Sequence, residues 1–576
     1  MIEVLTNAPR WARLRALAGP GALFLGLVTP LQAAAAREPV RPLNVIVIKT
    51  DDQRWDTLWA MPIVEQELGG RGVTFSNAFV STPLCCPERA SFLAGGFYAH
   101  NVGVLNNKPP NGGVTAFLDE DTLAVRLQRA GYRTALIGKY LNGYPLIEPY
   151  LPPGWTKFVH TTGRREDWVN YRATVGSSGP DAPDAGVTVH VSQYLTDFLR
   201  DQVIDFIREP DPSPYFVYFA PLAPHSPTIP APGDETLFAN YLYRERGYKE
   251  DDLSDKPYLR DEAERFRAVA ADNSHRRQLQ SLQAVDRAVG AIVQELQVLG
   301  QLDRTLLVFM SDNGYLWGEH WERTKSLPYE EAIRVPLVVV MPGVQPHEEG
   351  HLIVANLDIP TTIFEVAGLA RHDTDGRSLV PLLRDPGIAW RKEFLIESYP
   401  PDEERAQPDP SRPEVSVWAG LRTDRYKYTE WDSGHKVLFD LAADPFELQD
   451  EFHNPAYRSV ARTLAGTLLA TRGLALISPP PRVGEPGRTV AFQLAAWGGA
   501  TPYAWAVVQG RLPPGLSLDG STGLLSGTPT QVGTFPVSIQ VTDSSVSPYT
   551  GQPQIHTRPF RFIIAPPRRG PFTEPP

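Results

Sequence analysis

The chain has 576 residues, too many for a single hydrophobic core, so we expect two to four domains. Its 42% hydrophobic and 21% charged residues are typical of a globular protein, and its net charge of -11 argues against nucleic acid as a partner. The only two cysteines are adjacent, which argues against a framework of structural disulfides.

The first 36 residues have the pattern of a secretory signal peptide. Arginines at positions 10, 13 and 15 precede an apolar run over residues 16–31, and small residues follow at 33–36. The run is short for a membrane span and contains Gly19-Pro20; an uncleaved anchor is the alternative. No later segment has enough apolar residues to span a bilayer. We therefore expect a secreted or periplasmic protein with no integral membrane segment after cleavage.

The first strong structural signal is an apolar strand over residues 44–49 that leads directly into Asp51 and Asp52. A continuous apolar run is typical of a buried strand in a parallel sheet, and such sheets bind ligands at the carboxyl ends of their strands. The alternative is that one of the two aspartates only caps the next helix.

The segment 81–95 contains both cysteines. Cys85 comes just before an expected helix start, Pro87 suits the first turn of that helix, and Arg89 follows. This pattern suggests a nucleophile beside an anion-binding helix N-terminus. The alternatives are two small buried apolar residues or a vicinal disulfide.

Two further apolar strands, at residues 132–137 and 214–219, also end in polar side chains. Lys139 follows the first, and His225 follows the second in a proline-rich stretch that fixes its backbone. A surface lysine with a buried stem and a structural loop histidine are the alternatives. Between these strands, residues 153–200 are rich in Gly, Pro, Asp and Trp, which predicts a long irregular loop over the sheet.

The spacing of apolar residues over 279–296 predicts a core helix that ends at Gly300, whereas the polar insert 240–273 has no role that the sequence indicates. A fourth apolar strand, at residues 305–310, ends in Asp312 and Asn313, and another is expected at 335–341. The Asn-Gly pair at 313–314 is alternatively an ordinary hairpin turn.

Four strands thus end in polar groups, and such repetition at one sheet edge is what a converging active site would produce. Asp51, Asp52, Asp312 and Asn313 offer hard oxygen ligands without imidazole, which favours Ca²⁺ or Mg²⁺ over zinc.

These motifs occur in an order that resembles the sulfatase family from about residue 42 to 455. The matching segments are Asp-Asp-Gln at 51–53, Cys-x-Pro-x-Arg at 85–89, Gly-Lys-Tyr-Leu-Asn at 138–142, Pro-His-Ser-Pro at 224–227, Ser-Asp-Asn-Gly at 311–314 and Lys-x-x-x-Tyr-Glu at 325–330. The Cys-Cys-Pro and Gly-Lys-Tyr-Leu-Asn variants most resemble the N-acetylglucosamine-6-sulfatase and heparan endosulfatase branch.

The resemblance implies a catalytic role for Cys85. In this family the cysteine is oxidised to formylglycine by a formylglycine-generating enzyme, and the hydrated aldehyde attacks the sulfur of a sulfate ester. It further implies that His225 or Lys325 protonates the leaving oxygen. The residues that it places around the sulfate are Arg89, Lys139 and Lys325, and those that it places around one Ca²⁺ (or Mg²⁺) are Asp51, Asp52, Cys85, Asp312 and Asn313.

The sequence departs from the family pattern at three positions. Glu88 stands where serine or alanine is usual and Ala94 where threonine is usual, which bears on recognition by the formylglycine-generating enzyme. Leu141 replaces a histidine that many members carry two residues after the lysine. Candidates for the base that expels sulfate are therefore Asn142, His100 and His320.

The implied fold is an α/β domain like alkaline phosphatase, with a mixed, largely parallel sheet flanked by helices, and a small α+β C-terminal subdomain. Strands at 422–428 and 436–441 and a helix at 456–471 are expected in that subdomain. After the linker Ser478-Pro-Pro-Pro, alternating apolar residues and the run 512–529 resemble bacterial immunoglobulin-like repeats and predict a β-sandwich. The expected borders are signal peptide 1–36, catalytic domain 37–370, subdomain 371–473, sandwich 474–566 and disordered tail 567–576.

The sequence thus indicates an exported sulfatase that acts on sulfated sugars or aryl sulfates. One alternative is a phosphonate or phosphate ester hydrolase of the same superfamily. Another is a surface protein that binds glycans through its β-sandwich and has lost catalysis.

Overall fold

The structure is a computed structural model. It describes residues 42–162, 168–178, 186–256, 259, 274–369, 374–400, 416–476, 484–499, 501–544 and 553–566. The expected signal peptide at 1–36 and the expected tail at 567–576 lie outside the described residues.

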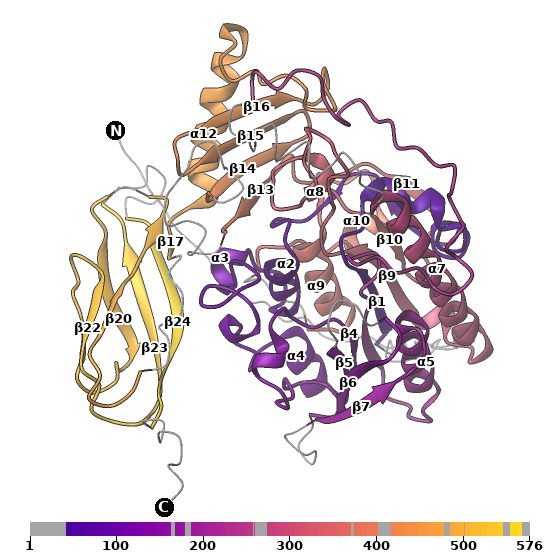
Figure 1. The fold of residues 1–576 in the computed structure, drawn as a ribbon, viewed down its shortest axis with the longest axis horizontal. Coiled ribbons are helices and arrows are strands. Elements are labelled where there is room, and N and C mark those ends of the chain that lie inside the picture. The colour runs from indigo at the N-terminus through magenta and orange to yellow at the C-terminus, as the bar shows by residue number, and fades with distance from the viewer. Residues whose placement is uncertain are drawn as a thin grey trace, which may run out of the picture. The chain divides into compact units, whose positions relative to one another are not determined.

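A ten-stranded mixed sheet forms the centre of the catalytic region (Figure 1), with strand order β11-β2-β10-β9-β1-β8-β4-β5-β6-β7. Strands β9, β1, β8, β4 and β5 are parallel neighbours, and antiparallel strands lie toward both edges. The strands are β1 Asn44–Thr50, β2 Val73–Phe75, β4 Arg133–Gly138, β5 Lys157–Thr162, β6 Tyr171–Gly176, β7 Val187–Val191, β8 Tyr215–Ala220, β9 Thr305–Ser311, β10 Leu337–Val340 and β11 His347–Glu349.

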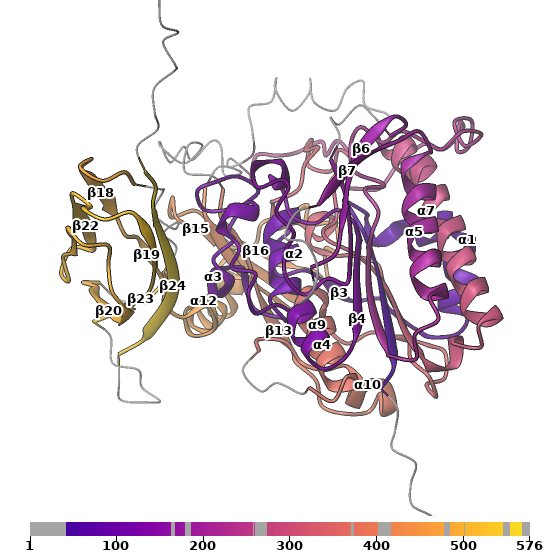
Figure 2. The same ribbon diagram turned by 90° about the horizontal axis from the view of Figure 1, so that it is seen from below.

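Both faces of this sheet are covered by helices, as Figure 2 shows. Alternate residues of β1 face opposite sides: Val45 and Val47 pack in one core cluster, and Ile46 and Ile48 in the other. The first cluster includes residues of α2 (Cys85–Leu93), α4 (Leu123–Arg129) and α9 (Ala355–Val366); the second includes residues of α5 (Leu195–Arg208) and α7 (Ser274–Val298). Because both faces are covered, the central strands are mostly apolar, and this explains the runs in the sequence.

The four strands expected to end at the active site are direct neighbours in the order β9-β1-β8-β4. They are parallel, with Ile48 paired to both Phe219 and Phe309. Their carboxyl ends therefore lie at one edge of the sheet, which confirms the predicted α/β fold class.

The prediction of one long irregular loop over residues 153–200 was wrong. This stretch supplies β5, β6 and β7 and the start of α5. The last strand is a sheet edge whose first four residues are solvent-exposed. The β7 sequence Val-Thr-Val-His-Val does alternate, but the strand is short and follows residues rich in Gly, Pro and Asp, which favour a loop.

The C-terminal subdomain is an antiparallel sheet of order β13-β14-β15-β16 with one helix, α12. These elements are β13 Glu393–Ser398, β14 Trp418–Thr423, β15 Tyr426–Trp431, β16 Lys436–Asp440 and α12 Arg458–Arg472. The single strand expected at 422–428 was wrong, since that segment spans the turn between β14 and β15.

The immunoglobulin-like region has two three-stranded antiparallel sheets, β18-β22-β21 and β20-β23-β24. Trp505, Ile539 and Phe562 lie in the apolar core of this region. The strands are β18 Val490–Gln493, β20 Ala504–Gly510, β21 Leu516–Leu518, β22 Leu524–Gly527, β23 Gly533–Thr542 and β24 Ile555–Ile564. Both sheets alternate inward and outward residues, as the sequence predicted.

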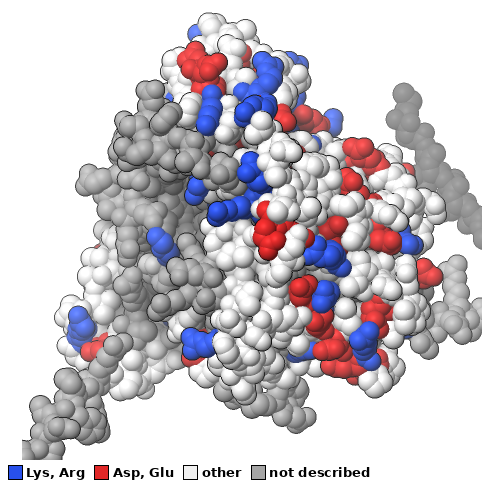
Figure 3. Space-filling model, turned by 45° about the vertical axis from the view of Figure 1, so that its right-hand side comes forward, with Lys and Arg blue, Asp and Glu red and all other residues white. Residues whose placement is uncertain are grey.

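On the face shown in Figure 3, acidic and basic side chains of the described residues lie interspersed. Among the described residues, no helix combines the length and the apolar character that a membrane span requires.

Candidate active site

Cys85 opens helix α2 and points at the carboxylates that follow β1. Its Sγ lies 3.5 Å from Asp51 Oδ1 and 4.0 Å from Asp52 Oδ1, and Lys325 Nζ lies 2.7 Å from the sulfur. Cys86, the next residue, is also a free thiol but packs in the apolar core. The structure therefore contains no vicinal disulfide, and the reading as a small buried apolar residue applies to Cys86 alone.

The carboxylates come from two adjacent strands. Thr50 at the end of β1 pairs with Ser311 at the end of β9, so Asp51, Asp52 and Asp312 follow side by side. The backbone N–H of Asp52 donates to Asp312 Oδ1 over 3.1 Å, and Asp52 has a φ of 67°, which is uncommon outside glycine. Neither Asp51 nor Asp52 caps the following 3₁₀ helix, which begins after Arg54 and has no side-chain cap.

Cationic side chains surround these carboxylates. Arg89 Nε donates to Asp312 Oδ2 over 2.8 Å, and Lys139 Nζ donates to Asp51 Oδ2 over 2.6 Å. Lys325 forms an ion pair with Asp52, whose second oxygen lies 3.7 Å from His225 Nε2. The structure thus brings together all nine residues that the sequence singled out: Asp51, Asp52, Cys85, Arg89, Lys139, His225, Asp312, Asn313 and Lys325.

We call Asp51, Asp52, Asp312 and Asn313 the acidic cluster. Ligand atoms of its three aspartates and of Cys85 all lie within 4.8 Å of one another, and all four residues are buried. The Asn313 amide N–H donates to Asp52 over 2.7 Å, while the buried Oδ1 of Asn313 has no hydrogen-bond partner in the described ranges. Several carboxylate oxygens and one free amide oxygen in a buried space fit a hard divalent cation.

Charge and burial set the protonation states at this site. Burial alone would raise the pKa of Asp51, but Lys139 and His225 lower it below its usual value. Burial raises the pKa of the Cys85 thiol well above its usual value, although Lys139 and Lys325 oppose this. An unmodified Cys85 is therefore a protonated thiol at neutral pH and a weak nucleophile.

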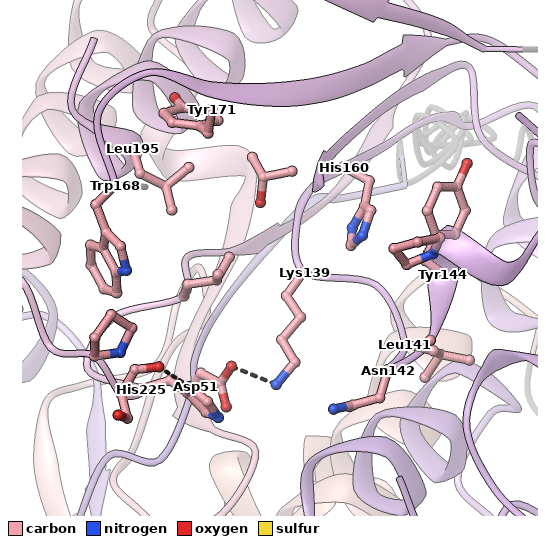
Figure 4. A pocket seen from close by; sticks show the side chains of 16 residues that line it. Asp51, Lys139, Leu141, Asn142, Tyr144, His160, Trp168, Tyr171, Leu195 and His225 are labelled. Atoms are coloured by element: carbon pink, nitrogen blue, oxygen red, sulfur yellow. Dashed lines mark hydrogen bonds and ion pairs between the residues drawn. The ribbon is translucent and has the colours of Figure 1, made fainter. Parts of the chain in front are cut away.

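A cavity of about 290 Å³ adjoins the acidic cluster, and we call it the side pocket. Asp51, Lys139 and His225 lie at one end of it, and Trp168 and Tyr171 line the opposite part (Figure 4). Its other lining residues are Leu141, Asn142, Gly143, Tyr144, Pro145, His160, Thr161, Leu195, Leu222, Ser226 and Pro227.

The side pocket contains polar atoms that have no hydrogen-bond partner among the described residues. These are Asn142 Oδ1, Thr161 Oγ1 and Tyr171 Oη, each buried and without a hydrogen bond. Because an unpaired buried polar atom costs free energy, a ligand with several hydroxyl or amide groups would restore the missing bonds. Trp168 adds an apolar ring to the same lining.

Of the three candidates for the base that expels sulfate, only Asn142 lines the side pocket. His100 Nδ1 lies 2.8 Å from Glu397, and His320 Nδ1 lies 2.6 Å from Glu250. Sequence reasoning missed His160, whose ring also lines the side pocket and whose pKa burial lowers to about 4. Its only signal was a histidine inside the stretch that we took for a loop.

Sequence reasoning also missed a buried ion pair between Lys49 on β1 and Glu88 on α2. Lys49 Nζ lies 2.6 Å from Glu88 Oε1, and both side chains are wholly buried. Burial lowers the pKa of Lys49 to about 8 and raises that of Glu88 to about 7, against the mutual attraction of the pair. A lysine at the end of an apolar strand was the available signal.

Family models match most of the chain. A model described as Sulfatase matches residues 43–369, and one described as N-sulphoglucosamine sulphohydrolase, C-terminal, matches residues 318–473. A model of an Ig domain matches residues 473–554.

Curated relatives and solved structures are also similar. The chain is 33% identical over 410 residues to human N-acetylglucosamine-6-sulfatase, covering 67% of this chain and 71% of the relative. It is 25% identical over 552 residues to N-acetylglucosamine-6-O-sulfatase of Bacteroides thetaiotaomicron, covering 81% and 94%. A solved protein in complex with its substrate D-glucosamine-2-N,6-O-disulfate has a TM-score of 0.63 at 24% identity, covering 75% of this chain and 98% of that one.

Proposed function

Since this chain belongs to the sulfatase family and is a sulfuric ester hydrolase, we propose that it cleaves sulfate esters of amino sugars with a formylglycine made from Cys85 and one Ca²⁺ ion. The observation that carries this proposal is the position of Cys85 Sγ, 3.5 and 4.0 Å from two carboxylate oxygens of the acidic cluster. Mg²⁺ is the alternative cation, because the donor set is mostly oxygen.

The acidic cluster and residue 85 would hold the cation. Bound there, a divalent cation supplies positive charge that stabilises the sulfate oxygens in the transition state. The high pKa of the Cys85 thiol supports a converted side chain, since the thiol itself is a weak nucleophile in this buried place.

The protein's own cations would complete the sulfate site. Lys139 and Lys325 hold their Nζ atoms at the carboxylates next to Cys85, and Arg89 has one buried guanidinium nitrogen, Nη2, without a hydrogen bond. Donors fixed in a buried site stabilise developing negative charge without reorganising. His225, at the end of the side pocket beside Asp52, is positioned to protonate the ester oxygen as it leaves.

The side pocket supports a sugar substrate. Its free polar atoms on Asn142, Thr161 and Tyr171 match the hydroxyl and amide groups of an amino sugar, and its volume of about 290 Å³ suits a small ring. Two relatives named for N-acetylglucosamine 6-sulfate hydrolysis favour that linkage. We propose an N-acetylglucosamine-like sulfate ester as the substrate.

We further propose an exported enzyme with a signal peptide over residues 1–36, a catalytic domain that ends near 370, a subdomain to 473 and an accessory β-sandwich. Maturation would require a formylglycine-generating enzyme as a partner. The arginines, the apolar run and the small residues at the N-terminus support export.

The decisive test is mass analysis of the peptide that contains Cys85, taken from active protein expressed with a formylglycine-generating enzyme. We expect the mass of an aldehyde or its hydrate at residue 85. An intact thiol in fully active protein would contradict the proposed nucleophile.

Two further measurements separate the alternatives. Kinetics on matched aryl sulfate and aryl phosphonate esters should show a preference for sulfate, and a preference for phosphonate would overturn the substrate class. Removal of residues 474–576 should leave hydrolysis intact. The binding-protein alternative would be supported by two results together. The full-length chain would hydrolyse no substrate, and removal of residues 474–576 would abolish glycan binding.

A further inference from the structure

The buried ion pair between Lys49 and Glu88 connects the two elements that carry the active site. Strand β1 leads to Asp51, and helix α2 begins with Cys85 and contains Arg89. The pair joins β1 and α2 over 2.6 Å, with both side chains 0% exposed.

The geometry places this pair directly beneath the contact between Cys85 and Asp51. Residues of odd number on β1, such as Val45 and Val47, face α2, so Lys49 lies on that face and Asp51 continues it. On the helix, Glu88 lies three residues after Cys85 and therefore on the same side. Two non-covalent contacts thus join the same faces of β1 and α2: the ion pair of Lys49 with Glu88, and, nearer the carboxyl end of the strand, the contact of Asp51 with Cys85.

Stability alone does not explain such a pair. Two charges removed from water are often no better than apolar side chains of the same volume, whereas removal of one partner leaves an uncompensated buried charge. Within the part of the chain that the structure describes, Glu88 Oε2 has no hydrogen-bond partner, so the carboxylate is incompletely satisfied. The Lys49 ammonium lies 3.8 Å from the centre of the Phe92 ring, which also belongs to α2.

We propose that Lys49 and Glu88 are positioning residues that fix the first turn of α2 against the end of β1 and so set the separation between residue 85 and Asp51. This role explains why Glu88 stands at a position where the sulfatase pattern has a small residue: its carboxylate is the partner of a lysine inside the sheet. The kinetic part of the test rests on the proposed function.

The first test removes both charges and nearly preserves side-chain size, with the double substitution Lys49→Met and Glu88→Gln. We expect a folded protein whose kcat falls about 10-fold or more with little change in KM, because a shift of about 1 Å between reacting groups costs that much or more. The matched control is Lys427→Met with Glu447→Gln, which removes another Lys–Glu pair with side chains 1% exposed, in the C-terminal subdomain. The control should keep the wild-type kcat.

The second test is Glu88→Asp, which keeps both charges and shortens the reach by one methylene. A positioning role predicts a lower kcat at unchanged KM, whereas a role in charge balance alone predicts the wild-type kcat. The single substitution Lys49→Arg keeps the charge and the pairing with Glu88. This variant should retain most of the wild-type kcat. If the double variant does not fold, these two variants still decide the question.

Crystal structures of the wild type and Glu88→Asp give a readout that does not depend on activity. Both proteins are expressed without a formylglycine-generating enzyme so that residue 85 stays a cysteine, and we expect the 3.5 Å separation between Cys85 Sγ and Asp51 Oδ1 to change in the variant. An unchanged separation together with the wild-type kcat would overturn the positioning role. A wild type that hydrolyses no sulfate ester would refute the proposed function, and the measured separation would still decide the role of the pair.

Discussion

The acidic cluster and the side pocket adjoin each other but are built differently. Asp51, Asp52, Asp312 and Asn313 follow two central strands, are almost wholly buried and are held by ion pairs and hydrogen bonds. The side pocket is lined mostly by residues of connecting segments and of strands toward the sheet edge, and several of its polar atoms have no partner. We conclude that the fold fixes the positions of the acidic cluster, whereas the residues that line the side pocket can differ between enzymes with different substrates.

The largest effect should come from residue 85. Cys85→Ala removes the side chain that we propose is converted to formylglycine, so we expect kcat to fall by about 10⁴-fold or more in assays with a sugar sulfate. Cys86→Ala is the matched control, since this neighbouring thiol packs in the core. It should cost some thermal stability and leave kcat unchanged; equal losses for the two variants would contradict the assignment.

Asp312→Asn should have the next largest effect. It removes the charge that pairs with Arg89 and weakens one of the proposed cation ligands, so we expect kcat to fall by about 10²- to 10³-fold and the Ca²⁺ affinity measured by calorimetry to drop. Asp286→Asn, at a buried carboxylate that accepts the N–H of Val64, should lower stability only. Unchanged Ca²⁺ affinity in Asp312→Asn would argue against the acidic cluster as the cation site.

His225→Gln tests the junction between the two regions. We expect kcat on a sugar sulfate to fall about 10²-fold, because an alkoxide needs a proton as it leaves. A nitrophenyl sulfate has a leaving group that needs no proton, so its kcat should change little. His347→Gln, at a histidine on the edge strand β11, should change neither value. Equal losses on both substrates would rule out a proton-donor role.

Tyr171→Phe tests the side pocket alone. The Tyr171 hydroxyl has no hydrogen-bond partner among the described residues, so its removal should not lower the unfolding temperature but should raise KM for the sugar sulfate about 10-fold, the value of one hydrogen bond. Tyr194→Phe should lower the unfolding temperature and leave KM unchanged, because the Tyr194 hydroxyl donates to the carbonyl of Ile229. A higher KM for a small aryl sulfate as well would contradict a sugar-specific contact.

The last prediction concerns stability in acid and not catalysis. His160 has an ordinary pKa of 6.5 in the unfolded chain and about 4 in the folded protein, so protonation favours the unfolded state. Its contribution is therefore complete above pH 6.5 and is lost as the pH falls toward 4, by at most about 3 kcal/mol. Urea unfolding at pH 7.5 and pH 4.5 should show a smaller loss for His160→Gln than for the wild type.

The sequence predicted the acidic cluster better than the side pocket, for a physical reason. Strands β1, β4, β8 and β9 are buried on both faces, so their apolar runs mark both the strands and the residues that follow them. Tyr171 begins β6 and Trp168 lies just before it, in a stretch whose short strands are set among residues rich in Gly, Pro and Asp, which favour a loop.

The pair of Lys49 and Glu88 shows a second limit. These residues are 39 positions apart, and nothing local links a lysine in a strand to a glutamate in a helix. In the sequence, Glu88 stands out only as a departure from a family pattern. Its partner Lys49 can be identified only once the packing of α2 on the sheet is known. Lys325 was found only through the motif, since no strand precedes it directly.

The complete burial of Cys85 has a consequence for biosynthesis. A converting enzyme must reach this side chain, and in the finished fold helix α2 and the sheet enclose it. If Cys85 is oxidised as we propose, oxidation has to occur before the chain closes around it. A molecule that folds before oxidation would stay inactive until it unfolds. The yield of active enzyme would therefore depend on the rate of Cys85 oxidation relative to the rate of folding.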